Sequence, residues 1–163
     1  MLFRSGGHYD VASGWIAPDA LAGADAVIHL AGASIGTHRW SAGRRAELRS
    51  SRVDSTRLLV DAIAAMERRP ATLIVASAIG YYGNRADALL DETSSLGEGF
   101  LADLVRDWET EANRAQALGV RVVSPRFGIV ISRRGGVLPQ MALPFRFGAG
   151  GPVGSGRQWM SWI

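Results

Sequence analysis

The sequence predicts an α/β fold in the form of a doubly wound parallel sheet, of which this chain holds an incomplete part. Apolar runs at 25–32, at 73–75 and at 120–124 predict three short strands. Two longer amphipathic stretches separate them and give the order strand, helix, strand, helix, strand. Because parallel strands joined by helices end at a common edge, ligands bind beside their carboxyl ends. We therefore expect a site at that edge.

Composition favours one compact domain and a cytoplasmic protein. The chain has 163 residues, of which 47% are hydrophobic, which suits a single core. No run reaches the roughly 18 apolar residues of a membrane helix, and no signal peptide opens the sequence, so no membrane partner is expected. Cysteine is absent, which excludes a disulfide framework and a thiolate metal site, and no metal is predicted.

The charge pattern gives little support to nucleic-acid binding. The formal net charge is +3, and every basic residue is arginine, since the sequence contains no lysine. The arginines are interspersed with acidic residues rather than gathered in one basic cluster. No nucleic-acid partner is predicted.

The first 24 residues predict an irregular lead-in, since they contain several glycines and no periodicity. Residues 25–32 then predict a buried strand that ends at Gly32. The small residues at 33–37 form a loop where a ligand can approach the backbone closely. Taken by itself, His29 is best interpreted as a core histidine bonded to a neighbour.

Residues 41–66 predict the longest helix, with Ser41 as its N-cap. Leu59, Ile63 and Met66 share one apolar face. The other face carries a run of arginines, which we interpret as solvated helix surface. The helix ends before Pro70.

The second strand, at 73–75, shows no polar alternation and is expected to be buried on both faces. Ser77, Tyr81 and Tyr82 follow it directly and would face the site. Ser77 has a second interpretation, as a strand-end hydroxyl that bonds local backbone.

The rest of the chain continues the pattern. An acidic loop at 83–98 is expected to be exposed, and the helix at 99–118 carries an apolar stripe expected to pack in the core and stops at Gly119. The predicted strand at 120–124, a short helix at 137–147 and the start of a strand at 158–163 follow. We divide the chain into a lead-in (1–24), a βαβαβ core (25–132) and the start of a substrate-side region (133–163).

Five short motifs together resemble the extended short-chain dehydrogenase/reductase superfamily: His29–Gly32, Ser77–Gly83, Trp108–Glu109, Arg126–Gly128 and Gly154–Trp159. Within it they are most similar to bacterial NAD-dependent epimerase/dehydratase proteins, also described as nucleoside-diphosphate-sugar epimerases. The similarity runs from about Asp25 to the last residue.

The resemblance implies a Rossmann fold that binds NAD or NADP and acts on a sugar nucleotide or a similar small polar substrate, as an epimerase, dehydratase or reductase. It implies that Ser77 hydrogen-bonds the reacting oxygen and that Tyr82, or else Tyr81, is the acid/base. Arg157 and Gln158 match the substrate side, and a homo-oligomer is also expected. The implied cofactor-binding residues are His29, Leu30, Ala31, Gly32, Ala76, Ser77, Arg126, Phe127 and Gly128.

The sequence departs from the family pattern before its first predicted strand. The family opens with a strand and a G-x-x-G-x-x-G turn that holds the cofactor's pyrophosphate at a helix N-terminus, and no such turn precedes Asp25. We therefore expect an internal fragment that lacks the first β-α-β unit and the C-terminal part. Cofactor binding by this chain alone is expected to be weak or absent, and catalysis absent.

The catalytic pattern departs as well. The superfamily uses Tyr-x-x-x-Lys, in which the lysine lowers the pKa of the tyrosine, and this sequence has no lysine. An ungapped match on Tyr82–Gly83 also places Ala78, rather than Ser77, in the hydroxyl position. Two alternatives therefore stay open: a non-catalytic nucleotide-binding sensor or scaffold, and an interaction domain without a ligand.

Overall fold

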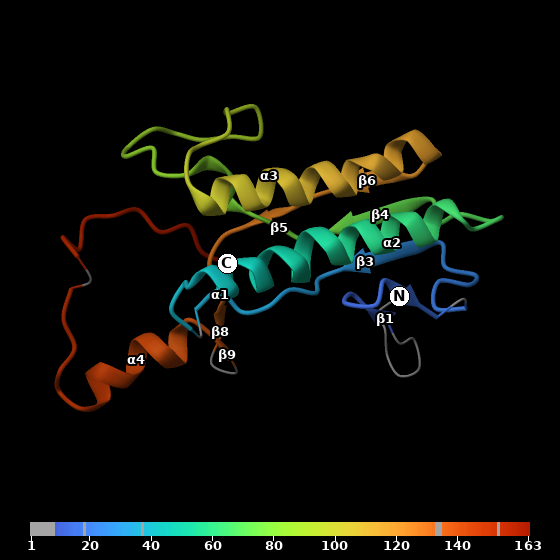
Figure 1. Ribbon diagram of the computed structural model, residues 1–163. Coiled ribbons are helices and arrows are strands. Elements are labelled where there is room, and N and C mark those ends of the chain that lie inside the picture. The colour runs from blue at the N-terminus through green and yellow to red at the C-terminus, as the bar shows by residue number, and fades with distance from the viewer. Residues whose placement is uncertain (1–8, 18, 37, 133–134, 153) are drawn as a thin grey trace.

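The computed structural model describes residues 9–17, 19–36, 38–132, 135–152 and 154–163, and it contains the predicted parallel sheet. The sheet order is β3 (Ala26–His29), β4 (Thr72–Val75), β6 (Arg121–Val123). Both neighbouring pairs are parallel, with His29 opposite Val75 and Ile74 opposite Val123 (Figure 1). This confirms the fold class and the βαβαβ order.

The predicted helix at 41–66 is continuous but not uniform. It consists of α1 (Ala42–Arg49), a π-helical segment η1 (Ser50–Asp54) and α2 (Ser55–Ala64). Ser41 is its N-cap, since its hydroxyl accepts a hydrogen bond from the backbone N–H of Arg44. The sequence pattern did not predict the π-helical segment.

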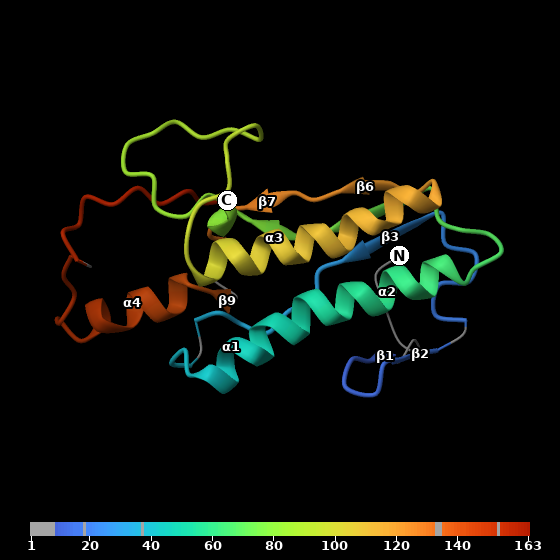
Figure 2. The ribbon, with the colours of Figure 1, turned by 45° about the horizontal axis from the view of Figure 1, so that its top comes forward.

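The second predicted helix comprises α3 (Phe100–Asn113) and the 3₁₀ segment η3 (Arg114–Leu118). Gly119 ends it with a φ of 78°, the left-handed conformation that glycine adopts without steric cost. Figures 1 and 2 show α2 and α3 lying side by side on the same face of the sheet. The predicted stop at Gly119 is thus confirmed.

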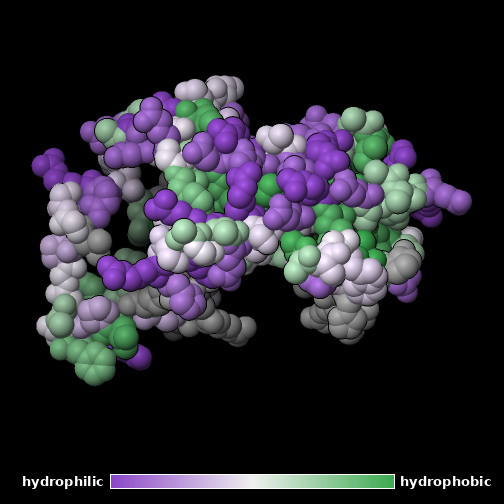
Figure 3. Space-filling view, in the orientation of Figure 1, coloured by the Kyte–Doolittle hydropathy of each residue, from purple (hydrophilic) through white to green (hydrophobic). Residues whose placement is uncertain are grey.

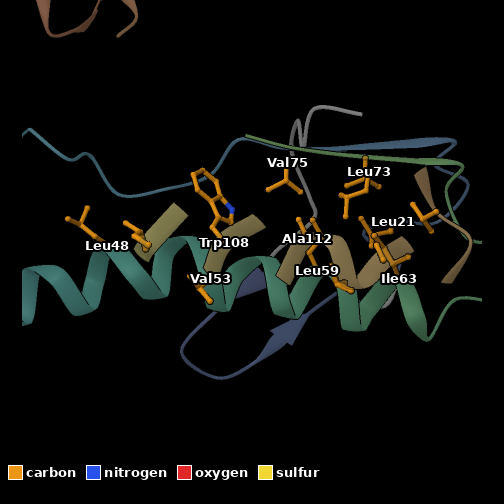
Figure 4. Packing of buried hydrophobic residues seen from close by; sticks show 14 residues of the cluster. Leu21, Leu48, Val53, Leu59, Ile63, Leu73, Val75, Trp108 and Ala112 are labelled. Atoms are coloured by element: carbon orange, nitrogen blue, oxygen red, sulfur yellow. The ribbon is translucent and has the colours of Figure 1, made fainter. Parts of the chain in front are cut away.

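The core lies between these helices and the sheet (Figure 4). Leu48, Ile63 and Leu73 are 0% exposed, and Trp108 of α3 packs among them while donating its indole N–H to Thr56 Oγ1 at 2.9 Å. The apolar stripe of α3 is therefore core, as predicted. Of the predicted stripe, Leu101 is half-buried and the other members are buried: Leu104, Val105, Trp108, Ala112 and Ala115.

Burial of the strands corrects one expectation. Leu73 and Val75 are buried, but Ile74 between them is only half-buried. Side chains alternate between the two faces of a strand, and the long helices that the described residues form cover a single face. The prediction that this strand is buried on both faces is therefore wrong for the structure described.

The lead-in contains a small hairpin where the sequence predicted irregular chain. Strand β1 (Tyr9–Asp10) pairs antiparallel with β2 (Trp15–Ile16). The carboxylate of Asp10 accepts from the N–H of Ala12 and from the Ser13 hydroxyl, which stabilises the turn between the strands. Residues 1–8 of the predicted lead-in lie outside the described part of the chain.

The last part of the chain leaves the sheet and its final residues pair with the segment that follows β7 (Arg126–Phe127). Strands β8 (Ile131–Ser132) and β9 (Gly135–Gly136) form an antiparallel pair before α4 (Leu138–Arg146), which confirms the short predicted helix. Backbone bonds then join Ile129 to Ser161 and Ile163, so only the end of the strand predicted at 158–163 pairs.

The surface of α4 is apolar. Leu143 and Phe145 in this helix and Phe147 after it are exposed, and Figure 3 shows hydrophobic surface in the region where Figure 1 places α4. By contrast, hydrophilic side chains dominate the surface over α2 and α3 (Figure 3). No helix among the described residues is long and apolar enough to cross a membrane.

Candidate functional site

The three predicted strand ends meet at one edge of the sheet. The N–H of Ala76 donates to the carbonyl of His29 at 2.9 Å, and the N–H of Ser77 donates to the carbonyl of Pro125 at 2.9 Å. Directly beyond, β5 (Ser77–Ala78) pairs in parallel with β7 (Arg126–Phe127). The segments after β3, β4 and β6 therefore lie side by side, as a ligand site at the carboxyl edge requires.

A group of polar side chains stands at this edge, and we call it the Glu109 cluster: Ser77, Tyr81, Tyr82, Glu109 and Arg126. Ser77 Oγ donates to Glu109 Oε1 at 2.5 Å. Arg126 donates from Nε to Oε1 of Glu109 at 2.9 Å and from Nη2 to Oε2 at 2.8 Å. Its third nitrogen, Nη1, donates to the hydroxyl oxygen of Tyr82 at 3.0 Å.

The electrostatics of the cluster depend on one partly buried ion pair. The side chains of Arg126 and Glu109 are 18% and 14% exposed. Hydrogen bonds to Glu109 are the main cause that raises the pKa of Arg126 above its ordinary value. The guanidinium also lies over the ring of Tyr81, with Cζ 3.5 Å from the ring centroid, which adds a cation–π contact.

This geometry fixes the direction of each hydrogen bond. Arginine has donors only, so the oxygen of Tyr82 accepts from Arg126 and its own hydrogen points elsewhere. Ser77 gives its hydrogen to Glu109, so its oxygen keeps acceptor capacity. Two nitrogens of the Arg126 guanidinium donate to the two oxygens of the Glu109 carboxylate. An external phosphate or carboxylate could bind Arg126 at two points in the same way only after the Arg126–Glu109 ion pair had opened.

The turn that carries the two tyrosines is tightly enclosed. It is the 3₁₀ segment η2 (Ile79–Tyr82), and Arg85 donates to the carbonyl of Tyr82 at 3.0 Å. A side chain at Gly97 would place its Cβ 2.1 Å from that same carbonyl oxygen, so only glycine fits there. The loop at 83–98 therefore closes over Tyr82, which is 8% exposed.

His29 is a buried neutral histidine. Its Nε2 lies 3.0 Å from Ser55 Oγ, and Ser55 gives its own hydrogen to the carbonyl of Ser51, so Nε2 is the donor. Burial lowers the pKa of His29 from 6.5 to about 4. These contacts agree with the interpretation of a core histidine bonded to a neighbour. Among the described residues, no group of three or more His, Asp or Glu side chains is placed to hold a metal ion.

A cavity of about 240 Å³ lies along β3 beside His29. Its walls are mostly apolar and come from the hairpin, from β3 with the residues after it, and from α2. They include Ile16, Ile28, Leu30, Leu58 and Leu59.

The other residues that the resemblance implicates have varied surroundings. Leu30 and Phe127 are exposed, while Ala31 and Ala76 are half-buried. Gly128 lacks a side chain because a Cβ there would lie 2.6 Å from the carbonyl oxygen of Ser161. The close backbone approach at Gly128 is therefore to the chain itself.

The two residues predicted for the substrate side also lie outside the Glu109 cluster. Arg157 and Gln158 are exposed on the loop that leads to 161–163. The backbone N–H of Arg157 donates to the Ser155 hydroxyl at 3.3 Å.

Sequence reasoning gave Glu109 no role, although a signal was present. Glu109 follows Val105 by four residues and precedes Ala112 by three, which places a carboxylate at the border of the apolar face of α3. A charged residue at such a position needs a partner, and Arg126 is that partner.

Comparison with known sequences gives a family. Residues 16–163 match the model of the NAD dependent epimerase/dehydratase family. An epimerase family protein of Mycobacterium bovis is 48% identical over 96% of this chain and 51% of its own length. An epimerase family protein of Bacillus subtilis is 41% identical over 85% of this chain and 46% of its own length. The chain spans about half the length of the curated relatives it matches.

Solved structures give the same fold. A human epimerase family protein, solved with NADPH, is 37% identical with a TM-score of 0.80, covering 90% of this chain and 52% of that protein. A nucleoside-diphosphate sugar epimerase from Corynebacterium glutamicum is 37% identical with a TM-score of 0.79, covering 96% and 32%. The chain therefore belongs to the NAD-dependent epimerase/dehydratase family, as shown by its match to the family model over residues 16–163, by its parallel sheet and by these similarities.

Proposed function

We propose that a protein carrying this chain, at the length of its relatives, binds NAD or NADP and acts as an epimerase, dehydratase or reductase on a sugar nucleotide or a similar polar substrate. The observation that carries the proposal is the meeting of three parallel strand ends at one edge, beside the Glu109 cluster. The human relative solved with NADPH supports a nicotinamide cofactor. More distant neighbours solved with UDP-glucuronic acid or UDP-glucose agree in fold alone.

The described residues fit one side of such a cofactor. The loop after β3 consists of small residues, and Leu30, Gly32 and Ser34 are exposed there, which leaves backbone accessible to a ligand. The family holds the cofactor's pyrophosphate with a glycine-rich turn at a helix N-terminus, and no G-x-x-G-x-x-G turn precedes Asp25 in this sequence, so we propose that the longer protein supplies that turn. This chain alone should therefore bind a dinucleotide weakly or not at all.

Residues of the chain would then orient a substrate beside the cofactor, which supplies hydride chemistry when bound. Ser77 would accept a hydrogen bond from the reacting hydroxyl, because its own hydrogen goes to Glu109. Tyr82 would hold or release a proton at its hydroxyl oxygen, where Arg126 donates; Tyr81 is the second candidate for this role.

A saturable titration tests the binding part. The longer protein should quench NADPH or NADH fluorescence with one site, and no binding at millimolar cofactor would defeat the proposal. Turnover is tested separately on a panel of sugar nucleotides, with Tyr82→Phe and Tyr81→Phe compared with the wild type.

The same cluster also favours a second function, a nucleotide-binding sensor or scaffold without catalysis. Ser77 and Tyr82 are 4% and 8% exposed, and both hydroxyl groups are engaged by neighbouring side chains. The sequence also has no lysine to activate a tyrosine. Cofactor binding without turnover would support this function, whereas turnover that disappears in Tyr82→Phe would exclude it.

A further inference from the structure

The loop after β3 is fastened to the helical segment beneath it through Ala33. The backbone N–H of Ala33 donates to Ser51 Oγ at 3.0 Å, and its carbonyl accepts from Arg52 Nη2 at 2.9 Å. Both backbone groups of one loop residue are thus bound by adjacent side chains of η1. A loop held in this way keeps its conformation before any ligand arrives.

The guanidinium of Arg52 lies against Gly32. A Cβ at Gly32 would sit 3.0 Å from Cζ of Arg52 and 3.2 Å from Nη2, so the missing side chain makes room for the arginine. Cζ of Arg52 also lies 5.5 Å from the ring centroid of Trp108. The half-buried Arg52 therefore lies close to both the loop and a core residue.

The π-helical turn accounts for this placement. A π turn holds one residue more than an α turn, and each added residue rotates the following face by roughly 100°. Ser51 and Arg52 lie within this turn and reach the loop, and Ser55 directly after it contacts His29 at the end of β3. Two residues of the π-helical segment and the first residue of α2 thus contact β3 and its loop.

Two further side chains bind the next carbonyls of the loop. Arg44 Nη2 donates to the carbonyl of Ser34, and Trp40 Nε1 donates to the carbonyl of Ile35 at 3.1 Å. Three consecutive carbonyls, counting that of Ala33, accept from side chains. This degree of restraint is unusual for an exposed loop, since loops are ordinarily the more mobile part of a fold.

The charge of Arg52 has no carboxylate partner among the described residues. Its donors go to backbone carbonyls and to a hydroxyl, whereas Arg49 and Arg57 on the outer face are paired with Asp107 and Glu111. Burial is the main cause that lowers the pKa of Arg52 below its ordinary value, and the neighbouring Arg44 adds to it. An anionic ligand at this loop would be attracted by that charge.

We propose that Arg52 is a positioning residue that holds Gly32 and Ala33 in the conformation to which an anionic dinucleotide binds. This inference rests on the proposed function. Arg52 does not have to touch the ligand: it fixes the loop through Ala33 and supplies a positive charge behind it.

The test compares Arg52→Met with Arg52→Lys, and uses Arg49→Met as the matched control on the same helix. Methionine replaces the aliphatic part of the arginine side chain but removes every donor, whereas lysine keeps the charge and an ammonium donor for the carbonyl of Ala33. In the longer protein, Arg52→Met should raise the Kd for NADPH at least about tenfold, while Arg52→Lys should stay within about threefold of wild type. Arg49→Met should bind as the wild type does.

Amide hydrogen exchange provides a readout that does not need the cofactor. In this chain, Arg52→Met should speed exchange at Ala33 at least about tenfold, with exchange in α3 unchanged. If Arg52→Met does not fold, Arg52→Gln replaces it, because glutamine keeps a donor but is too short to reach Ala33.

The outcomes are distinguishable. A wild type that fails to bind NADPH overturns the proposed function and with it this inference. A wild type that binds, together with an Arg52→Met that binds equally well or an Arg49→Met that loses as much, overturns the inference alone. Weakened binding in Arg52→Met, with recovery in Arg52→Lys and faster loop exchange, supports it.

Discussion

Replacing Glu109 with alanine should destabilise the fold strongly, because one carboxylate holds the cluster together. It accepts two hydrogen bonds from Arg126 and one from Ser77. Its removal leaves a guanidinium that is 18% exposed, and in the cluster only the Tyr82 hydroxyl and the ring of Tyr81 remain as its partners. Removing one partner of a buried ion pair lowers the free energy of unfolding by more than the pair itself contributed, because the remaining charge stays desolvated without compensation.

The expected loss is about 3 kcal/mol in the free energy of unfolding, at the lower end of the range for breaking a buried pair, because both side chains keep some exposure. For a domain of this size, each kcal/mol moves Tm by about 2–4 °C, so a fall of about 6–12 °C should accompany it. Urea unfolding followed by tryptophan fluorescence measures the first quantity, and calorimetry measures the second.

Asp61→Ala is the matched control, because its partner Arg114 and Asp61 itself are about half exposed and such pairs contribute less than about 1 kcal/mol. In the double variant Glu109→Ala/Arg126→Met, the decrease in the free energy of unfolding should be at least about 1 kcal/mol smaller than the sum of the decreases in the two single variants, because the two residues interact directly. Equal losses in Glu109→Ala and Asp61→Ala would refute the reasoning.

Three further outcomes follow from individual contacts. Burial depresses the pKa of His29 to about 4, so the stability that its neutral form contributes is full above pH 6.5 and is lost as the pH falls toward 4. The free energy of unfolding should therefore drop by about 2 kcal/mol between pH 7 and pH 5. In urea titrations at several pH values, His29→Gln should show a weaker dependence on pH than the wild type. Gly97→Ala should lower the free energy of unfolding by at least about 2 kcal/mol, since its Cβ would collide with the carbonyl oxygen of Tyr82. Gly43→Ala, in open space on α1, should raise the free energy of unfolding by about 0.5–1 kcal/mol. Thermal melts that give Gly97→Ala the higher Tm would contradict this. Trp108→Phe should lower the free energy of unfolding by about 1–3 kcal/mol, because the Thr56 hydroxyl loses its buried hydrogen-bond partner. A change below about 0.5 kcal/mol, which is within the range of ordinary surface substitutions, would contradict this prediction.

Several local features were predictable from the sequence because neighbouring residues determine them. Gly119 stops its helix, and Ser41 caps the first one. The strand predicted at 73–75 is present, but it is buried on one face rather than on both, since Leu73 and Val75 are buried and Ile74 is only half-buried. Periodicity shows that a strand is apolar, and it does not show which of its faces a helix covers.

The site residues were predicted less completely. Ser77, Tyr82 and Arg126 do come together, as the shared edge of three strands implied. Glu109 joins them from a helix more than two turns past its start, and no local pattern links it to Arg126, 17 residues later. The same holds for Arg52 and Ala33, which are 19 residues apart and meet through a π turn that propensities do not signal.

The sequence by itself determined the three strands of the parallel sheet, the two long helices between them, their order, and therefore the edge at which the strand ends meet. Those properties follow from apolar spacing, caps and glycines, which act over a few residues. Only the tertiary structure decided that Ser77 turns to Glu109, that Arg126 is occupied by an internal carboxylate, and that Arg52 lies beneath Gly32. Partner choice among charged side chains depends on distances across the fold, and these exist only once the helices have packed on the sheet.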